Sequence, residues 1–290
     1  MKNIVILIPV YNDWESLKKL LEEINQNIKD FSNFNFDCLV INDSSVIDQP
    51  KLTKPINLRS LRIMNMRENR GHARCNAFGI RYISKNIEFD YVILMDGDGE
   101  DRPIEIKSLV EEILKNPKNS VVAKRIKRSE GFFFQFLYQS HKLMTYIFTG
   151  KKINFGNYSC LTKEDTKKLS SIGSLWSSYS GTVKKNLKKL NEIDSIRGSR
   201  YFGPSQMSLL KLLIHSFSII AVFKYTVFLR SIFLLLVLFF LKEHLETYSF
   251  LMMGIIIIFN ILIFIISLRE KEKDLLNSQL NLRDIKNITH

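Results

Sequence analysis

Four carboxylates lie close together in the stretch YVILMDGDGEDRP, which runs from Tyr91 to Pro103. Asp96, Asp98, Glu100 and Asp101 directly follow an apolar run. Like charges at this spacing repel one another, so no carboxylate is stabilised by its neighbours. Such a cluster either binds a cation or forms a solvated acidic turn, and the rest of the chain has to distinguish the two.

Two known motifs with similar residues do not match this cluster. A calcium-binding loop that starts at Asp96 needs Gly at its sixth position and Glu at its twelfth. Asp101 and Lys107 stand there instead, so this alternative is excluded. The nucleophile motif DxDGT of haloacid-dehalogenase-like phosphatases is disfavoured, because Glu100 replaces the Thr and the preceding strand is not the first one.

Strand-like and helix-like segments alternate through the first half of the chain. Near-continuous apolar runs are typical of parallel strands that are covered on both faces, and alternation with helices predicts a doubly wound α/β domain with a mostly parallel sheet. The predicted strands are residues 3–10, 36–43, 61–66, 91–96 and 120–124, and the predicted helices are residues 14–29, 72–84 and 103–116.

Polar side chains follow three of these strands, at the point where each strand ends. Tyr11 follows the first, Asp43 the second, and Asp96 and Asp98 the strand that begins at Tyr91. In open α/β sheets, ligands bind at the carboxyl ends of the strands. We therefore expect these four side chains to meet at one edge, which favours a ligand site over a solvated turn.

The net charge limits the class of binding partner, and the cysteines indicate the redox state of the compartment. The chain has 290 residues and a formal charge of +13, which suggests nucleic acid, phosphates or an acidic membrane as partner. Nucleic acid is disfavoured, because no known binding motif is present and the acidic cluster would repel it. Cys38, Cys75 and Cys160 form no pair, and we interpret them as buried residues in a reducing compartment.

The last third of the chain contains two long apolar segments. Thr247–Leu268 lacks charges, and Tyr225–Leu241 carries only Arg230 near its start. At 1.5 Å per residue, a helix of about 20 residues spans a hydrocarbon core of about 30 Å. The short loop KEHLET between them predicts a transmembrane hairpin, and flanking Lys and Arg residues predict both ends in the cytoplasm. The aromatic-rich segment 131–150 is either core or a helix at the membrane interface.

The motifs taken together resemble family 2 glycosyltransferases with the GT-A fold, in particular the branch of polyprenyl- and dolichyl-phosphate sugar transferases. Each motif is short, but their order and spacing over Ile4–Ser208 are specific, and a hairpin after them also fits this branch. The motifs are IPVYND, INDSS, NRGHARCNAFGIRY, MDGDGEDRP, VVAKRIKR, NFGNYS and RYFGPSQMS.

The resemblance implies a role for the acidic cluster. Asp96 and Asp98 match the family's metal-binding DxD pair, in which Mg²⁺ or Mn²⁺ holds the diphosphate of a nucleotide-sugar donor. Asp101 matches a further acidic position that orients metal or acceptor, and we expect Glu100 to be solvated. With Asp96, the residues Pro9, Tyr11 and Asp43 match positions that bind the nucleotide sugar.

The resemblance also implies phosphate contacts from basic residues. Arg125, Arg128 and Arg200 match arginines that face phosphates in similar enzymes, and Ser205 lies near the last of them. Guanidinium groups suit bidentate contacts to phosphate. We interpret Asp98, Asp101, Arg128 and Arg200 as catalytic, and Arg125, Asn157 and Ser205 as binding the phosphate of the acceptor.

Two residues depart from the pattern of the branch. Asn157 stands where Asp is frequent after Phe-Gly, and Gln206 stands where Lys is frequent. The first change removes a general base and the second a phosphate contact, so both bear on the acceptor more than on the donor. His72, His141 and His215 lack metal-ligand spacing, and we interpret them as structural.

These observations predict a membrane-anchored inverting glycosyltransferase that transfers a sugar from a nucleotide donor to a polyprenyl phosphate at the cytoplasmic membrane. The alternatives are a transferase that extends a lipid-linked glycan or surface polysaccharide precursor, and a catalytically silent scaffold, and self-association is left open. The predicted parts are a GT-A domain (1–208), an interfacial segment (209–224), two transmembrane helices (225–268) and a cytoplasmic tail (269–290).

Overall fold

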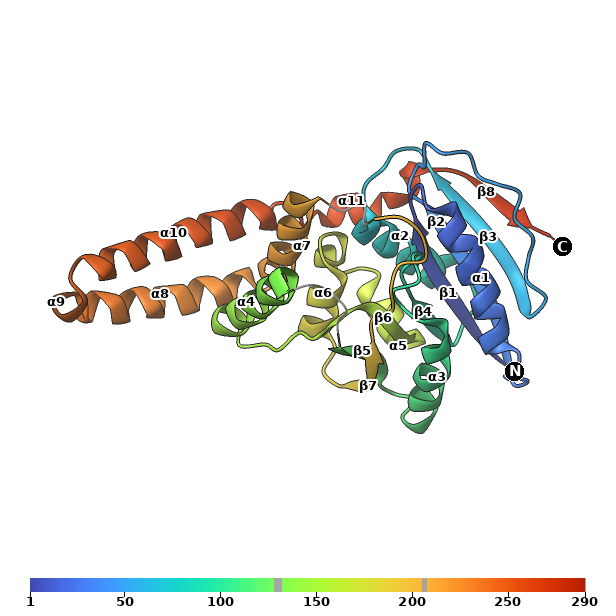
Figure 1. Cartoon of the computed structure of the whole chain (residues 1–290), viewed down its shortest axis with the longest axis horizontal. Coiled ribbons are helices and arrows are strands. Elements are labelled where there is room, and N and C mark those ends of the chain that lie inside the picture. Colours follow the sequence, from blue (N-terminus) through green and yellow to red (C-terminus); the bar gives the residue numbers. More distant parts are fainter. Residues whose placement is uncertain (128–131, 205–207, 290) are drawn as a thin grey trace.

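The computed structural model describes residues 1–127, 132–204 and 208–289. It consists of an α/β body and a pair of long helices that extends from one side of the body (Figure 1). Both chain termini lie at the body, and the turn between the two long helices lies at the far tip.

The body is built on one eight-stranded sheet with the order β7-β5-β6-β4-β1-β2-β3-β8. Four neighbouring strands, β3, β2, β1 and β4, are parallel, whereas β6 runs antiparallel to both of its neighbours and β8 antiparallel to β3. The prediction of an α/β fold with a mostly parallel sheet is confirmed for this central part. The strands are β1 (Lys2–Val10), β2 (Phe34–Asn42), β3 (Leu58–Met66), β4 (Tyr91–Leu94), β5 (Ser120–Lys127), β6 (Phe155–Thr162), β7 (Leu190–Ile196) and β8 (Leu282–Ile288).

Helices cover both faces of the sheet, which explains the near-continuous apolar strands. Along β1, alternate residues point to opposite faces: Ile6 packs against α1 and α3, and Leu7 packs against α2. All three cysteines are buried and unpaired, as predicted. The helices of the body are α1 (Trp14–Ile28), α2 (His72–Asn86), η1 (Pro103–Glu105), α3 (Ile106–Lys115), α4 (Phe132–Thr149), α5 (Lys163–Leu169), η2 (Gly173–Trp176) and α6 (Tyr179–Asn186).

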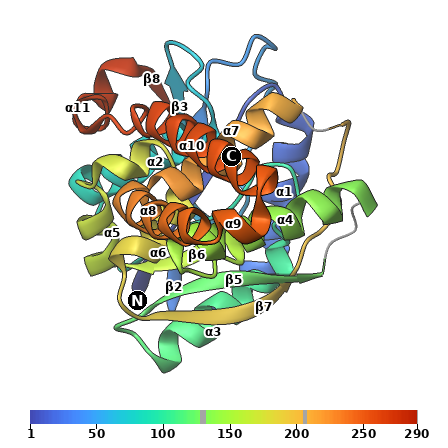
Figure 2. The same ribbon diagram turned by 90° about the vertical axis from the view of Figure 1, so that its left-hand side faces the viewer.

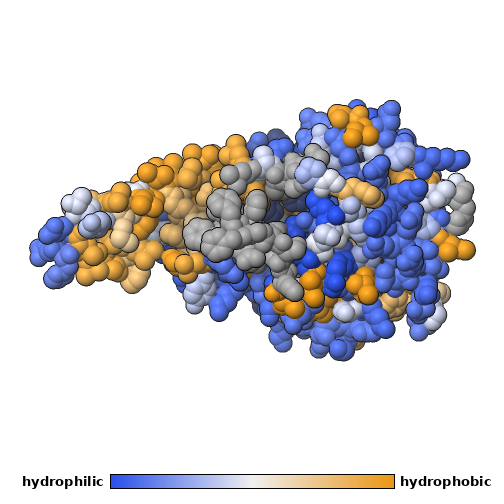
Figure 3. All heavy atoms as spheres, viewed as in Figure 1, coloured by the Kyte–Doolittle hydropathy of each residue, from blue (hydrophilic) through white to orange (hydrophobic). Residues whose placement is uncertain are grey.

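Two apolar helices leave the body together and pack side by side. α7 (Leu209–Ala221) leads into α8 (Lys224–Phe240), and the short α9 (Lys242–Leu245) connects α8 to α10 (Thr247–Ser267). Figure 2 shows the pair from its tip, and Figure 3 shows that apolar residues cover its surface. Within the described residues, only α10 is long and apolar enough to cross a membrane alone. α7 and α8 would provide a second span only if they are counted together, and an 86° bend separates them.

The segment after α10 returns to the body, where a cytoplasmic tail at residues 269–290 was expected. α11 (Glu272–Leu276) and η3 (Ser278–Asn281) lead into β8, which pairs with β3. Leu275 is fully buried in the core on the α2 side of the sheet. This return was not predicted because β8 is charged and half exposed, as edge strands commonly are, and lacks the apolar run of a central strand.

Candidate active site

The acidic cluster lies in the loop that follows β4, beside the end of β1. β1 and β4 are neighbours from which the chain winds in opposite directions, so this is the switch point where α/β sheets bind ligands. Gly97 lies so close to β1 that a Cβ atom there would be 2.8 Å from the Pro9 carbonyl oxygen. The predicted placement of Asp96 and Asp98 at the carboxyl edge of the sheet is therefore observed, beside the end of β1.

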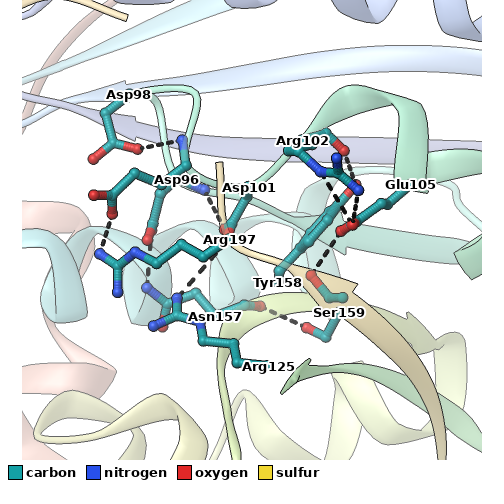
Figure 4. A network of polar contacts seen from close by, with 12 residues as sticks. Asp96, Asp98, Asp101, Arg102, Glu105, Arg125, Asn157, Tyr158, Ser159 and Arg197 are labelled. Carbon is teal, nitrogen blue, oxygen red and sulfur yellow. Dashed lines mark hydrogen bonds and ion pairs between the residues drawn. The ribbon is translucent and has the colours of Figure 1, made fainter. Parts of the chain in front are cut away.

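Asp96 and Asp98 are held by different partners (Figure 4). Asn157 on β6 donates from Nδ2 to Asp96 Oδ1 at 2.9 Å. Asp98 accepts a backbone bond from Glu100 at 3.0 Å through Oδ1 and an ion-paired bond from Arg200 Nη1 at 2.6 Å through Oδ2. Burial and the negative charges of Asp96 and Glu100 raise the pKa of Asp98 to about 6. A cation at this position is therefore electrostatically favoured.

Asp101 forms a hydrogen bond within the acidic loop, on its buried side. Its side chain is buried, and Oδ2 accepts the backbone N–H of Asp96 at 2.9 Å. Burial and the charge of Asp96 raise the pKa of Asp101 to about 8, although Arg125 lies 3.8 Å from its Oδ1 and opposes this shift. Burial thus favours the neutral form of Asp101 more than in a free Asp side chain.

A strap formed by residues 197–202 lies over the acidic loop. The Arg197 guanidinium pairs with Glu100, and the Gly198 N–H donates to the Glu100 carbonyl oxygen at 2.8 Å. The Tyr201 N–H donates to the Asp98 carbonyl oxygen at 3.0 Å. The expectation that Glu100 is solvated is therefore wrong, because the strap folds back onto it from a distant part of the chain.

Arg200, at the centre of this strap, bridges two carboxylates. Besides its bond to Asp98, it donates from Nη2 to Asp13 Oδ2 at 2.6 Å. Asp13 was not among the predicted site residues. The motif IPVYND contains it, but nothing local distinguishes it from a helix-capping Asp ahead of α1. Arg200 thus acts as the counter-ion of the acidic pair in this structure.

Gly99 is required by the contact between the acidic loop and the strap. It has a positive φ of 88°, and a Cβ atom there would lie 2.5 Å from the ring of Tyr201. The Tyr201 hydroxyl donates to Glu23 on α1 at 2.6 Å, which fixes the ring in place. Any larger residue at position 99 would separate the strap from the acidic loop.

The residues predicted to bind the nucleotide lie at the neighbouring strand ends. Tyr11 is 37% exposed after β1, so its ring is accessible to a ligand. Asp43 after β2 is buried, and its two oxygens accept the backbone N–H groups of Arg70 at 2.9 Å and Gly71 at 2.7 Å. Its carboxylate is thus used to hold the loop between β3 and α2, and burial raises its pKa.

The basic residues are only partly brought together. Arg125 on β5 is mostly buried and packs over Gly156, where a Cβ atom would lie 2.6 Å from Nη2. It therefore faces Asp101 and the segment that contains Gly156 and Asn157. Arg128, Ser205 and Gln206 lie outside the described residues.

The histidines interpreted as structural are nearer to the site than expected. The rings of His72 on α2 and His215 on α7 lie 5.2 Å apart, and His215 interacts electrostatically with Asp96 and Arg125. Burial, and next the neighbouring His72, lower the pKa of His215 to about 3, so this ring is neutral at pH 7. α7 brings His215 there, and no local pattern in the sequence indicated it.

The acidic pair fits a divalent ion that is bound mainly through its substrate. In the described part of the chain, no three His, Cys, Asp or Glu side chains are arranged to hold a metal. Mg²⁺ is typically bound by one or two carboxylates together with substrate phosphates and water. Asp96 and Asp98 supply such a pair, and the raised pKa of Asp98 indicates an excess of negative charge that a cation would relieve.

Structural comparisons agree with the fold. The chain aligns with glucosyl-3-phosphoglycerate synthase from Mycobacterium tuberculosis, solved with Mn²⁺, UDP-glucose and phosphoglyceric acid, at 14% identity and a TM-score of 0.53, covering 78% of this chain and 80% of that one. It also aligns with S. aureus TarS 1–349 in complex with UDP-GlcNAc at 14% identity and a TM-score of 0.50, covering 85% and 73%. At such identities the likeness establishes the fold alone.

The curated relatives of this chain include transferases that are named for undecaprenyl phosphate. The undecaprenyl-phosphate 4-deoxy-4-formamido-L-arabinose transferases of Serratia proteamaculans and Pectobacterium carotovorum are 25% and 26% identical over 219 and 217 residues. The alignments cover 73% of this chain and 65% of each relative. Residues 5–178, more than half of the chain, match glycosyl transferase family 2, and the protein therefore belongs to that family.

Proposed function

We propose that this protein is a membrane-anchored inverting glycosyltransferase that transfers a sugar from a nucleotide-sugar donor to a polyprenyl phosphate at the cytoplasmic face of the membrane. The observation that carries the proposal is the pair Asp96 and Asp98 at the switch point of the sheet, with Arg200 as the counter-ion of Asp98. This arrangement suits a ligand that brings its own anionic oxygens and a divalent cation.

The donor half of the reaction uses the acidic pair and the strap. Asp96 and Asp98 would hold Mg²⁺ or Mn²⁺, which supplies Lewis-acid stabilisation of the charge that develops on the leaving diphosphate. Arg200 Nη1, which bonds to Asp98 in this structure, would then bind a diphosphate oxygen, while Asp13 would keep its bond to Nη2. Tyr11 provides an exposed ring for the nucleoside.

The acceptor half needs no strong general base if the acceptor is a phosphate. The second pKa of a phosphate monoester is about 6, so this nucleophile is largely ionised at pH 7. In that case Asp101 need not act as a base, and its buried side chain would hold the acidic loop through its bond to the Asp96 N–H. Arg125 and Arg128 would offset the charge of the acceptor, while Asn157 and Ser205 orient it.

The relatives support the acceptor class. Two of them carry undecaprenyl phosphate in their names, which is a polyprenyl phosphate. The apolar pair α8 and α10 gives the same proposal a physical basis, because a lipid acceptor must be met at a membrane.

The test of the function is a transfer assay in membranes that contain the full chain. We expect one member of a panel of labelled nucleotide sugars to yield a lipid product whose mass equals that of the sugar plus polyprenyl phosphate minus one water, with release of the nucleoside diphosphate. A product in which the sugar is linked to a hydroxyl of a lipid-linked glycan would replace the proposed acceptor. Failure of every donor to react or hydrolyse would contradict a transferase.

The proposed topology places the tip of the helix pair across the membrane from the body. The chain enters α8 from α7 and returns from α10 to β8, so both ends of the pair meet the same body. We expect His244→Cys, in α9, to be labelled in intact cells by an impermeant thiol reagent. The native cysteines are buried and should contribute little background.

The matched control for topology is Lys107→Cys on α3, whose side chain is 70% exposed in the body. It should react only after the cells are permeabilised. Labelling of position 107 in intact cells with protection of position 244 would invert the proposed orientation, and protection of both would place the pair on one side of the membrane.

A further inference from the structure

The segment that follows the helix pair contacts the loops at the proposed nucleoside site. The loop 67–71 connects β3 to α2 at the carboxyl edge of the sheet, and Asp43 holds its far end through the N–H groups of Arg70 and Gly71. The near end of the same loop is held by Asn281, which lies more than two hundred residues further along the chain.

Asn281 binds this loop through both its backbone and its side chain. Its carbonyl oxygen accepts the Arg67 N–H at 2.7 Å. Its Oδ1 accepts the Glu68 N–H at 3.2 Å, and its Nδ2 donates to the Glu68 carbonyl oxygen at 3.1 Å. Asn281 is only 4% exposed, so these bonds are shielded from water. Asn281 therefore fixes the conformation of the start of the loop.

A second connection runs across the strands themselves. Asp284 on β8, Asn65 on β3 and Asn42 on β2 are register partners at the same edge of the sheet. Asn65 donates to Asp284 Oδ1 at 2.6 Å, and Asn42 donates to Asn65 Oδ1 at 2.8 Å. This row of side chains ends at the loop after β2, because Asn42 Oδ1 accepts the Ser45 N–H at 3.0 Å.

The loops 43–45 and 67–71 thus have one common support. Ser44 Oγ donates to the Arg67 carbonyl oxygen at 3.3 Å, and Asp43 binds the far end of loop 67–71, so the two loops also contact each other. Loop 43–45 in turn is joined to the loop after β1, since the Asn12 N–H donates to Ser45 Oγ at 2.9 Å. Tyr11 is the neighbour of Asn12, so this network extends to the exposed ring.

We propose that Asn281 and Asp284 are positioning residues for the nucleoside part of the donor. They hold loops 67–71 and 43–45 in the conformation that a nucleoside diphosphate recognises, without touching it themselves. The inference rests on the proposed function, because it assumes that a nucleoside diphosphate binds at this edge. It adds that the chain beyond the helix pair is a part of the donor site.

The experiment measures nucleotide binding and transfer by the full-length protein and by Asn281→Ala. The probes are UDP, GDP, CDP and ADP, each with MnCl₂. We expect Asn281→Ala to weaken binding of the preferred nucleotide, and to raise KM for the donor, roughly five- to tenfold, since it loses two buried hydrogen bonds. The kcat at saturating donor should stay within about twofold, because nucleotide binding restores the loop conformation.

Hydrogen exchange gives a readout that activity does not. Without nucleotide, backbone amides of residues 67–71 should exchange faster in Asn281→Ala than in the unaltered protein, and saturating nucleotide should restore their protection. Asp284→Ala, which changes a half-exposed residue and so leaves folding intact, should produce a smaller shift of the same kind in both assays. The matched control is Asn287→Ala, an exposed Asn on the same strand that pairs with Arg62 far from the edge.

The outcomes separate the two proposals. Binding and KM that are unchanged in both variants would overturn the positioning role while leaving the transferase intact. An equal loss in Asn287→Ala, or a fall in kcat without a change in KM, would also overturn it by indicating a merely structural role for the strand. If the unaltered protein binds none of the four nucleotides, the proposed function fails, and this inference fails with it.

Discussion

Replacing Asp98 with Ala is expected to lower the rate of sugar transfer about a thousandfold or more. The reason is that a metal ion that stabilises the leaving diphosphate contributes several kcal/mol, and each 1.36 kcal/mol changes the rate by a factor of ten. The side chain lies in a loop at a strand end, outside both cores. Folding should therefore be retained, and thermal unfolding of the variant measures this directly.

The control for the Asp98 variant is Glu100→Gln in the same loop. It removes one negative charge and weakens the pair with Arg197, but it leaves the proposed ligands in place. We expect it to keep roughly a tenth of the activity or more, because the Gln amide oxygen can still accept a hydrogen bond from Arg197 and both proposed metal ligands stay in place. Transfer that persists in Asp98→Ala, or in the unaltered protein with excess chelator, would exclude the metal role.

Arg200→Ala is expected to lower transfer about a hundredfold or more, and Asn157→Ala by less than about tenfold, because Arg200 is a cationic donor to two carboxylates whereas Asn157 is a neutral donor to one. Arg200 bridges Asp13 and Asp98 in this structure and would contact the diphosphate when the donor is bound. Asn157 donates one bond to Asp96, so its loss changes the orientation of one carboxylate.

The kinetic constants of the two variants test these roles separately. For Arg200→Ala we expect a fall in kcat/KM that Arg200→Lys does not restore, since an ammonium group cannot bridge two anions in the planar geometry of a guanidinium. A loss in Asn157→Ala as large as that in Arg200→Ala would indicate that Asn157 is essential. If polyprenyl phosphate is refused and a sugar hydroxyl is glycosylated, the argument from an ionised acceptor is wrong.

The local pattern of the sequence was sufficient for the central part of the fold and for the acidic pair. Buried parallel strands need apolar residues at every position, so their apolar runs identify them without knowledge of their partners. The ends of such strands lie at one edge of the sheet by topology, which is why Tyr11, Asp43, Asp96 and Asp98 could be grouped in advance.

Tertiary structure decided everything that depends on contacts between distant segments. The strap at 197–202 folds onto the acidic loop and pairs Arg197 with Glu100, which the sequence analysis had left in solvent. Asp13 joins the site only through Arg200, and His215 only through the packing of α7. An ion pair between residues far apart leaves no periodic signal, since surface and site charges look alike in a sequence.

The C-terminal strand is a part of the fold that the local pattern of the sequence did not predict. Residues 282–288 are charged and half exposed, so neither their hydropathy nor their position after two apolar helices predicts a strand. β3 would otherwise be an unpaired edge, and pairing with β8 satisfies its backbone N–H and C=O groups. The sequence by itself therefore determined the buried strands, the apolar helices and the carboxylates at the sheet edge. Only the folded chain decided which edge strand closes the sheet and which charges meet, because backbone pairing and long-range ion pairs depend on which segments lie side by side.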